Sequence, residues 1–102
     1  MIQYVNNVKL AGVVYSLKTT QIQNSFSYRF VLVVNNIYTD KDKQACVDVQ
    51  HIPISYFSSS SEEFSDKDNV EVEGRISTKT YVTSDNNTRK YFEIHANKIK
   101  KL

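Results

Sequence analysis

The sequence predicts an all-β protein of five strands, with one short helix between the third and the fourth. Two observations predict it: turn-forming clusters separate five β-rich runs, and apolar residues alternate with polar ones in the last third of the chain. The fourth run shows this alternation best, because Val70, Val72, Gly74 and Ile76 fall on one side of a strand. That side can enter a core while the other faces solvent.

The first three strands are expected at Val8 to Leu17, Phe26 to Tyr38 and Ala45 to Ile54. Gly12 lies inside the first, where an interior glycine often marks a bend or bulge, as at a barrel corner. Lys18 to Ser25 is polar and is interpreted as a loop. The apolar run Phe30 to Val34 indicates burial on both faces, by the core and by a partner subunit. Pro53 is expected at an edge or end of its strand.

The helix is expected from about Ser61 to Asp66, because Ser59 and Glu62, or Ser60 and Glu63, have the spacing of a capping box. The last two strands are expected at Asn69 to Val82 and Tyr91 to Ile99, joined by the polar turn Ser84 to Thr88. This order of elements is typical of a five-stranded Greek-key barrel of the OB type. With 102 residues, the chain is expected to be a single domain over residues 1–102.

Charge is unevenly distributed along the chain, although the formal net charge is only +2. Six of the eleven acidic residues lie between residues 62 and 73, with a single cation, Lys67, among them. The rest of the chain carries 12 basic and 5 acidic residues. A basic body with one acidic patch favours a polyanionic partner. The alternative is two solvated faces without a partner.

The outward side of the fourth strand combines cations with an aromatic ring. Arg75, Lys79 and Tyr81 alternate onto it, and this mixture suits single-stranded nucleic acid, whose phosphates attract cations and whose bases stack on rings. Stacking is the favoured interpretation for Tyr81, whereas the residues alone leave Tyr38 undecided. For the other tyrosines weighed, packing or a subunit contact is favoured: Tyr4, Tyr15, Tyr28 and Tyr56.

Several classes of function are disfavoured by composition and spacing. No apolar run approaches the ~18 residues of a membrane span, and the N-terminus does not resemble a signal peptide. Cys46, the only cysteine, excludes an internal disulfide and is compatible with the cytosol. His51 and His95 fall on different strands, beside no nucleophile motif and without zinc-type spacing. We therefore expect no enzyme activity, no metal, no cofactor and no membrane partner.

Four segments resemble bacterial single-stranded-DNA-binding proteins. Asn7 to Gly12 looks like their opening strand, and Phe30 to Tyr38 with the charged turn Asp40 to Lys43 resembles their second. Val70 to Tyr81 and Tyr91 to Ile99 resemble their last two strands most closely. The match covers nearly the whole chain and is weak over residues 18–25 and 50–68. A short relative, primosomal replication protein N, has a similar length.

The resemblance implies roles for particular residues. The base-stacking aromatics of the family correspond to Tyr38 and Tyr81, and a third stacking position falls near Cys46, which is not aromatic. The chain ends at Leu102 without the glycine-rich linker and acidic tip of the main cellular proteins. This difference favours a restart-type, phage or plasmid-borne accessory protein.

The expected function is binding of single-stranded DNA in replication, replication restart or recombination, with little sequence preference. Tyr38 and Tyr81 would stack on bases, while cations would contact phosphates: Arg75, Lys79, Arg89, Lys90, Lys43, Lys9 and Arg29. The expected location is the cytoplasm, associated with the nucleoid. The resemblance also implies a homodimer or homotetramer, with other replication or restart proteins as further partners. Two alternatives stay open: a protein–protein interaction module, and an RNA-binding protein.

Overall fold

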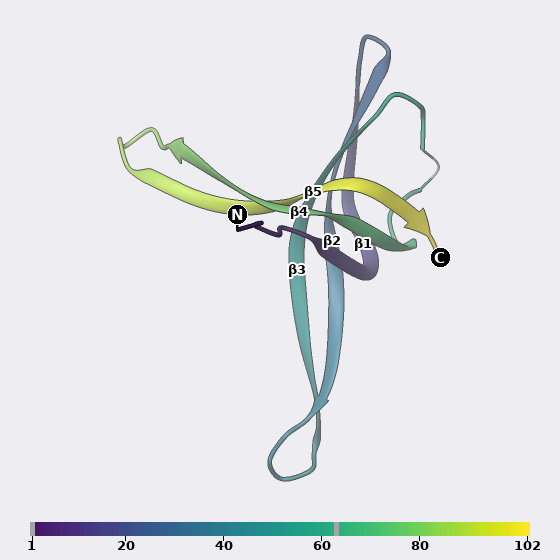
Figure 1. Ribbon diagram of the computed structural model, residues 1–102, viewed down its shortest axis with the longest axis vertical. Helices are drawn as coiled ribbons and strands as arrows, with labels where there is room; N and C mark the ends of the chain where they lie inside the picture. The colour runs from purple at the N-terminus through teal and green to yellow at the C-terminus, as the bar shows by residue number, and fades with distance from the viewer. Residues whose placement is uncertain (1, 63) are drawn as a thin grey trace.

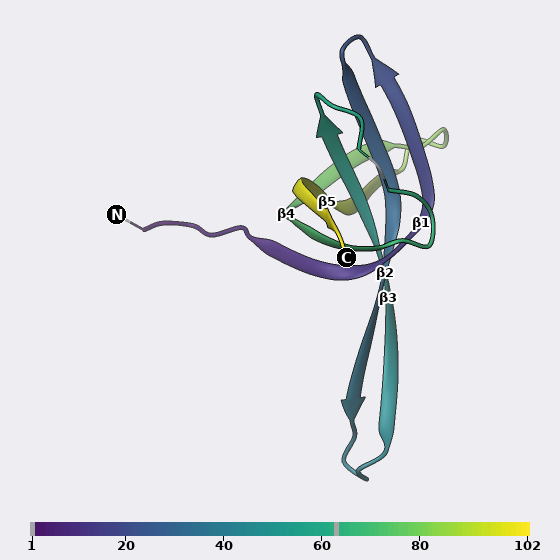
Figure 2. The ribbon, with the colours of Figure 1, turned by 90° about the vertical axis from the view of Figure 1, so that its right-hand side faces the viewer.

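Five strands close into a barrel in the computed structural model, which describes residues 2–62 and 64–102 (Figures 1 and 2). The strands are β1 (Val8–Ile22), β2 (Ser25–Thr39), β3 (Ala45–Ser58), β4 (Asn69–Val82) and β5 (Thr88–Lys101). Their order around the barrel is β1-β2-β3-β5-β4, and only the β3–β5 pair is parallel. The prediction of an all-β, five-stranded closed architecture, consistent with the OB type, is therefore confirmed.

β1 belongs to both sides of the barrel. Its first part, Val8–Val13, pairs with β4, and from Val13 onward it pairs with β2. Gly12 lies next to this change of partner, where a Cβ atom would come within 2.3 Å of the carbonyl oxygen of Val33. Only glycine therefore allows the strands to approach this closely, and the corner expected from the sequence is found at this residue.

Alternation along the strands fills the barrel interior. Odd and even positions point to opposite sides of each strand, so within the barrel every second residue faces the interior. The buried core cluster of the described residues consists of Val14, Phe30, Leu32, Ile54, Val70, Val72 and Ile94. Ile54 and Ile94 are opposite each other where β3 and β5 meet, and the parallel pairing there covers only Ile54–Tyr56 and residues 94–96. Pro53 immediately precedes this pairing, at a point where β3 is paired with β2 and not yet with β5. β3 is an edge strand there, which is where a proline without an N–H is tolerated.

The loop predicted for Lys18 to Ser25 is wrong. β1 continues to Ile22, and β2 begins at Ser25, so that only two residues join them. Gln23, the first of the two, has a positive φ of 53°. The polar residues of this segment still pair with β2 in register, which shows that cross-strand pairing prevails over weak local β propensity.

The short helix predicted from Ser61 to Asp66 is also wrong, because the described residues include no helix. In a capping box, the Glu62 carboxylate would accept a hydrogen bond from the backbone N–H of Ser59. Instead it accepts hydrogen bonds from the hydroxyls of Tyr56 (3.3 Å) and Ser58 (3.2 Å). The backbone N–H of Glu62 donates to the hydroxyl of Tyr28 at 2.7 Å. Tertiary contacts thus use the groups that a helix start would need.

Phe64 makes aromatic contacts with two residues of β2. The ring of Phe64 lies 5.2 Å from the ring of Tyr28 and 5.5 Å from that of Phe30, measured between centroids. These contacts attach the segment to the barrel. Glu63, one half of the other serine–glutamate pair, lies outside the described residues.

No helix long and apolar enough to cross a membrane occurs among the residues described.

Besides the β1–β2 hairpin, which points upward in Figure 1, the β2–β3 and β4–β5 hairpins extend beyond the barrel in different directions. The β2–β3 hairpin reaches downward in this view, and the β4–β5 hairpin reaches to the left. Both strands of each hairpin pair with each other as far as the turn. β4 and β5 include the predicted strands Asn69 to Val82 and Tyr91 to Ile99, although β5 begins earlier, at Thr88.

Candidate nucleic-acid interface

The outward face of the β4–β5 hairpin gathers charged and aromatic residues from both strands. In register, Tyr81 lies opposite Arg89, Lys79 opposite Tyr91, Ser77 opposite Glu93, and Arg75 opposite His95. Since side chains alternate between the two sides of a strand, these eight share one side of the sheet. We call this surface the hairpin face: Arg75, Ser77, Lys79, Tyr81, Arg89, Tyr91, Glu93 and His95.

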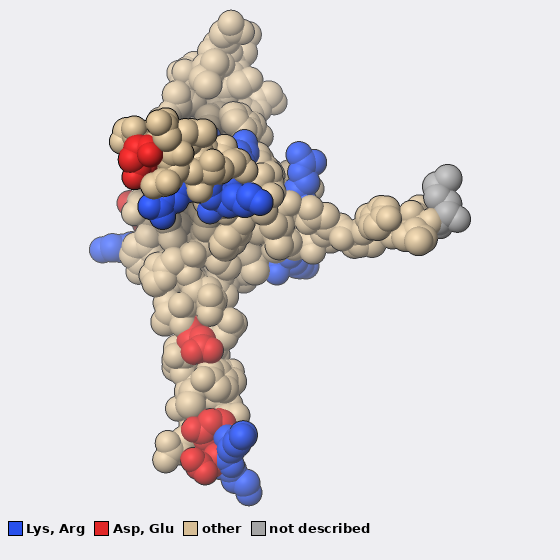
Figure 3. Space-filling model, turned by 90° about the vertical axis from the view of Figure 1, so that its left-hand side faces the viewer, with Lys and Arg blue, Asp and Glu red and all other residues tan. Residues whose placement is uncertain are grey.

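Positive charge marks this region of the molecule. Figure 3, which looks toward the end of the β4–β5 hairpin, shows Lys and Arg side chains gathered along it. At the end of the β2–β3 hairpin, at the bottom of the view, they mix with Asp and Glu. From the sequence, residues 77–92 carry Lys79, Arg89 and Lys90 against one acid, Asp85. The β4–β5 hairpin is therefore the more favourable of the two for a polyanion.

Two tyrosine rings form an aromatic pair on the hairpin face. The centroids of Tyr81 and Tyr91 are 5.7 Å apart, and the rings are inclined by 63°, an edge-to-face arrangement. Tyr81 is 48% exposed and Tyr91 is 41% exposed. Both rings are thus held by each other yet remain open to a stacking partner.

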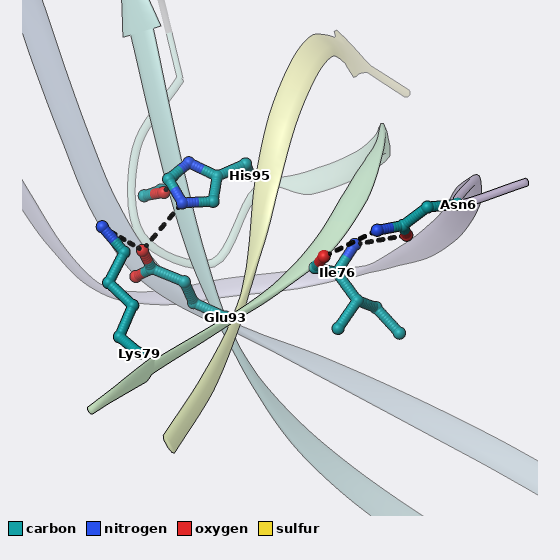
Figure 4. Close-up of polar contacts among 6 residues, drawn as sticks. Asn6, Ile76, Lys79, Glu93 and His95 are labelled. Carbon is teal, nitrogen blue, oxygen red and sulfur yellow. Dashed lines mark hydrogen bonds and ion pairs between the residues drawn. The ribbon is translucent and has the colours of Figure 1, made fainter. Parts of the chain in front are cut away.

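A buried carboxylate lies at the base of the same face (Figure 4). The Oε1 atom of Glu93 is 3.7 Å from Nζ of Lys79 and 3.1 Å from Nε2 of His95, while the other ring nitrogen of His95 is 3.2 Å from the Ser55 hydroxyl. The Glu93 side chain is 7% exposed, and Oε1 has no regular hydrogen bond among the described residues. A buried carboxylate is costly unless a cation accompanies it, so Lys79 is the charged partner of Glu93, and the His95 ring lies beside the same oxygen.

Ser55, His95 and Glu93 form a chain of contacts that resembles the serine, histidine and acid of a nucleophilic catalyst. Ser55 is only 1% exposed, so a substrate carbonyl cannot reach its oxygen. The contact between Ser55 and His95 therefore joins β3 to β5, whose parallel register places these residues opposite each other.

A cleft of about 340 Å³ adjoins Tyr91 and Glu93. Lys18 of β1 and Arg29 of β2 supply cations to its lining. They are themselves neighbours in the β1–β2 register. Apolar side chains line the rest, among them Val31 and Pro53. The cleft thus combines a ring, two cations and an apolar wall, which are the groups that contact bases and phosphates of a single strand.

The opposite side of the hairpin differs in chemistry. Lys90 lies there, opposite Thr80, and Phe92 lies opposite Thr78. Phe92 is as exposed as the two tyrosines. Within the paired segment 75–95, however, Lys90 is the only cation on this side of the hairpin. At the barrel end, the Asn6 carboxamide binds both the N–H (2.9 Å) and the C=O (2.8 Å) of Ile76, as Figure 4 shows. The N-terminal segment is therefore attached beside this second side.

Two expected site residues lie on the β2–β3 hairpin, away from the hairpin face. Tyr38 is opposite Cys46 and is 47% exposed. Lys43 lies in the turn, with a positive φ of 63° and its N–H bonded to the carbonyl of Asp40. The Asp40 carboxylate accepts hydrogen bonds from the N–H groups of Gln44 and Asp42, and these, Gln44 first, lower the pKa of Asp40. Lys43 therefore has an ionised carboxylate in the same turn at neutral pH.

Lys9 is placed among acids. Its Nζ atom lies 3.5 Å from Glu71 and 3.7 Å from Glu73 on β4, so these carboxylates largely offset its charge.

Of the nine residues expected from the sequence, four share the hairpin face (Arg75, Lys79, Tyr81 and Arg89), and Arg29 lines the adjoining cleft.

The sequence alone does not single out Tyr91, Lys18 or Glu93. Their proximity depends on the β4–β5 register and on the extension of β1, neither of which the residues themselves reveal. Parity gives one usable signal: Tyr91 is two residues before Glu93 and four before His95, so all three share a side.

A closed five-stranded barrel carrying an exposed face of tyrosines and cations defines a nucleic-acid-binding protein of the OB class. The family model for the single-strand binding protein family matches residues 5–102. The chain therefore belongs to the single-strand binding protein family, and the expectation of a single-stranded-DNA-binding protein is confirmed.

Solved structures show the same fold at low sequence identity. One is a Plasmodium falciparum SSB in complex with single-stranded DNA, with a TM-score of 0.85 and 15% identity, covering 100% of this chain and 98% of that one. Another is a deletion mutant of the Thermus aquaticus single-stranded-DNA-binding protein, with a TM-score of 0.80 and 14% identity. That match covers 96% of this chain but 50% of the Thermus chain. No curated protein sequence matches the chain significantly.

Proposed function

We propose that this protein is a single OB-fold domain over residues 1–102 that binds single-stranded DNA across the hairpin face and the adjoining cleft. The observation that carries the proposal is the shared face of the Tyr81–Tyr91 pair and the cations around it. Bases stack on the two rings, and phosphates contact the neighbouring cations: Arg75, Lys79, Arg89, Arg29 and Lys18. None of these groups discriminates strongly between bases, so sequence preference is small.

The path of the strand extends to the second hairpin in this proposal. Tyr38 provides a further stacking ring, supported by its exposure and by the family resemblance. Three expected cations contribute less. Lys90 lies on the other side of the hairpin. Lys43 shares a turn with Asp40, and Lys9 lies between Glu71 and Glu73. The biological role is in replication, replication restart or recombination, in the cytoplasm and without catalysis.

A fluorescent oligothymidine tests the binding mode. Anisotropy titrations at two salt concentrations are expected to show tighter binding than to a duplex of equal length, with affinity that falls as salt rises. An oligouridine of the same length measures the preference for DNA over RNA. Equal affinity for duplex, or none for either, would contradict the proposal.

A homodimer or homotetramer is the proposed assembly. On one side of the β2–β3 hairpin, Ile37 (77% exposed), Val47 (58%) and Val49 (49%) extend the row formed by Val31 and Val33. The chain exposes 7926 Å², whereas a compact monomer of 11.8 kDa exposes about 5900 Å². Light scattering at micromolar concentration is expected to give a multiple of the monomer mass.

The same apolar row favours a second candidate function, a docking module for another replication or restart protein. The mixed charges at the end of this hairpin suit a protein surface better than a phosphate backbone. The replacement Ile37→Ser separates the candidates. Loss of self-association supports the homo-oligomer, whereas a monomeric wild type supports docking of another protein.

A further inference from the structure

Glu93 is an acid placed inside a surface that would bind an anion. Its side chain is 7% exposed, and its Oε1 atom contacts the Lys79 ammonium group at 3.7 Å and the His95 ring at 3.1 Å. Lys79 itself is 45% exposed, so solvent and ligands reach it from the outside. Lys79 therefore has two competing anionic partners once DNA arrives: the carboxylate beneath it and a phosphate above it.

Among the described residues, the other charged groups of the hairpin face and of the cleft lining are cations. From β4 come Lys79 and Arg75, which lies opposite His95 in register. From β1 and β2, Lys18 and Arg29 line the same cleft as Glu93, and β3 contributes the neutral Ser55. A bound phosphate chain brings negative charge onto this cation-lined face and so offers Lys79 a second anionic partner.

The contact with phosphate leaves the buried carboxylate in need of another cation. When the Lys79 ammonium group turns toward phosphate, Oε1 of Glu93 keeps no charged partner unless His95 is protonated. An isolated buried carboxylate is strongly unfavourable, so the imidazolium form of His95 is stabilised at that moment.

Ser55 allows His95 to exist in both charge states. Its hydroxyl lies 3.2 Å from Nδ1 and can donate to the neutral ring or accept from the charged one. The protonated ring has Glu93 Oε1 3.1 Å from its Nε2 atom and the Ser55 oxygen 3.2 Å from its Nδ1 atom.

Resting on the proposed function, we infer that Glu93 is a positioning residue of the DNA interface that holds Lys79 in the free protein and releases it to phosphate while His95 takes up one proton. The proton comes from solvent and is returned when DNA dissociates. Binding of single-stranded DNA is therefore tighter at lower pH within the range where histidine titrates.

The test is the dissociation constant for oligothymidine between pH 6 and pH 8, at fixed ionic strength, measured by anisotropy. Neither thymine nor the phosphodiester titrates in this range, and the described chain has two histidines, His51 and His95. The affinity of the wild type is expected to fall roughly three- to tenfold from pH 6 to pH 8. Glu93→Gln is expected to bind without this dependence, because a neutral amide needs no imidazolium partner.

Two histidine variants separate the switch from other titrations. His95→Gln is expected to lose the pH dependence, whereas His51→Gln, on the exposed part of β3, keeps it. Persistence of the pH dependence in His95→Gln overturns the inference. Calorimetry of the wild type in two buffers of different ionisation enthalpy counts the protons directly and needs no variant. Tight binding without proton uptake overturns the inference alone, whereas no binding at any pH overturns the proposed function.

Discussion

Tyr81 and Tyr91 meet edge to face across the β4–β5 hairpin, with their ring centroids 5.7 Å apart. Tyr91 is followed directly by Phe92, which is similarly exposed but points to the other side of the sheet. These neighbours allow the binding side of the hairpin to be determined by substitution.

Replacing Tyr91 by alanine is expected to weaken oligothymidine binding by about 1–3 kcal/mol, the usual contribution of one stacked base. The slope of log affinity against log salt stays unchanged, since no phosphate contact is lost. Phe92→Ala is the matched control and binds like the wild type. The opposite ranking of the two variants in anisotropy titrations would move the interface to the other side of the hairpin.

The double variant Tyr81→Ala/Tyr91→Ala is expected to lose less affinity than the sum of its two single variants. Each ring supports the other, so the first truncation already loosens the second platform. A double-mutant cycle on binding measures the coupling, expected at about 0.5–1.5 kcal/mol. Strict additivity would show that the rings act as independent platforms.

Arg89 and Lys90 provide a similar comparison for charge. Arg89→Ala is expected to lower the salt slope by about 0.7, the value for one phosphate contact on a single strand. Lys90→Ala, one residue further and on the other side of the hairpin, changes the slope less. Titrations at several salt concentrations provide both slopes, and equal losses would mean that DNA surrounds the hairpin tip.

Gly74 is required by the close approach of β4 and β5. A Cβ atom there would lie 2.1 Å from the carbonyl oxygen of His95, and 2.8 Å from the Cα of Ala96. Gly74→Ala is therefore expected to lower the free energy of unfolding by about 1–3 kcal/mol, the usual cost of overpacking. Urea denaturation measures it, with Thr78→Ala, an exposed site on the same strand, as the control. A midpoint equal to that of the wild type would show that the backbones can separate at no cost.

Asp68 is expected to make stability depend on pH. Its carboxylate accepts the N–H of Ser65 at 2.9 Å and lies 3.5 Å from the Lys101 ammonium group. These contacts, the Ser65 bond first, hold the pKa of Asp68 below its ordinary value of 3.8. Because the folded-state pKa is the lower one, the stabilisation is complete above the unfolded value and is lost as pH falls through the folded value.

Asp68→Asn should therefore melt earlier than the wild type at pH 7, and the difference should shrink as the pH falls below 3.8. Thermal unfolding by circular dichroism at pH 7 and at about pH 2.5 compares the two proteins. Asp48→Asn, an exposed site on the β2–β3 hairpin, is the control. A difference that persists undiminished in acid would assign the effect to the shape of the loop rather than to its charge.

The accuracy of the sequence-based prediction varied with how strongly each segment alternates. Asn69 to Val82 was predicted with its correct bounds, because Val70 and Val72 enter the core while their neighbours do not. Lys18 to Ser25 has no such contrast, so its strand depends on pairing with β2, which is a nonlocal property. The serine-rich segment suggested a helix start, but Tyr28 and Tyr56 use the polar groups of Glu62.

The candidate site shows the same limit. Arg75, Lys79 and Tyr81 follow from alternation within one strand, but Tyr91 joins them only through the register across the hairpin. Lys18 and Arg29 lie on β1 and β2 and line the same cleft as Tyr91, which no local pattern indicates. The sequence gives His95 no nucleophile motif and no zinc-type spacing, and its contacts with Glu93 and Ser55 depend on the pairing of β5 with β3.

Because the β2–β3 and β4–β5 hairpins project beyond the barrel, the residues that bind ligand are different from the residues that stabilise the fold. Residues such as Tyr81, Arg89 and Tyr38 contribute nothing to the core cluster, so their replacement leaves the interior packing intact. Local opening near the hairpin tips can likewise occur without global unfolding. Evolution can therefore alter the length, charge and aromatic content of these extensions, and so the ligand preference, while the same barrel continues to fold.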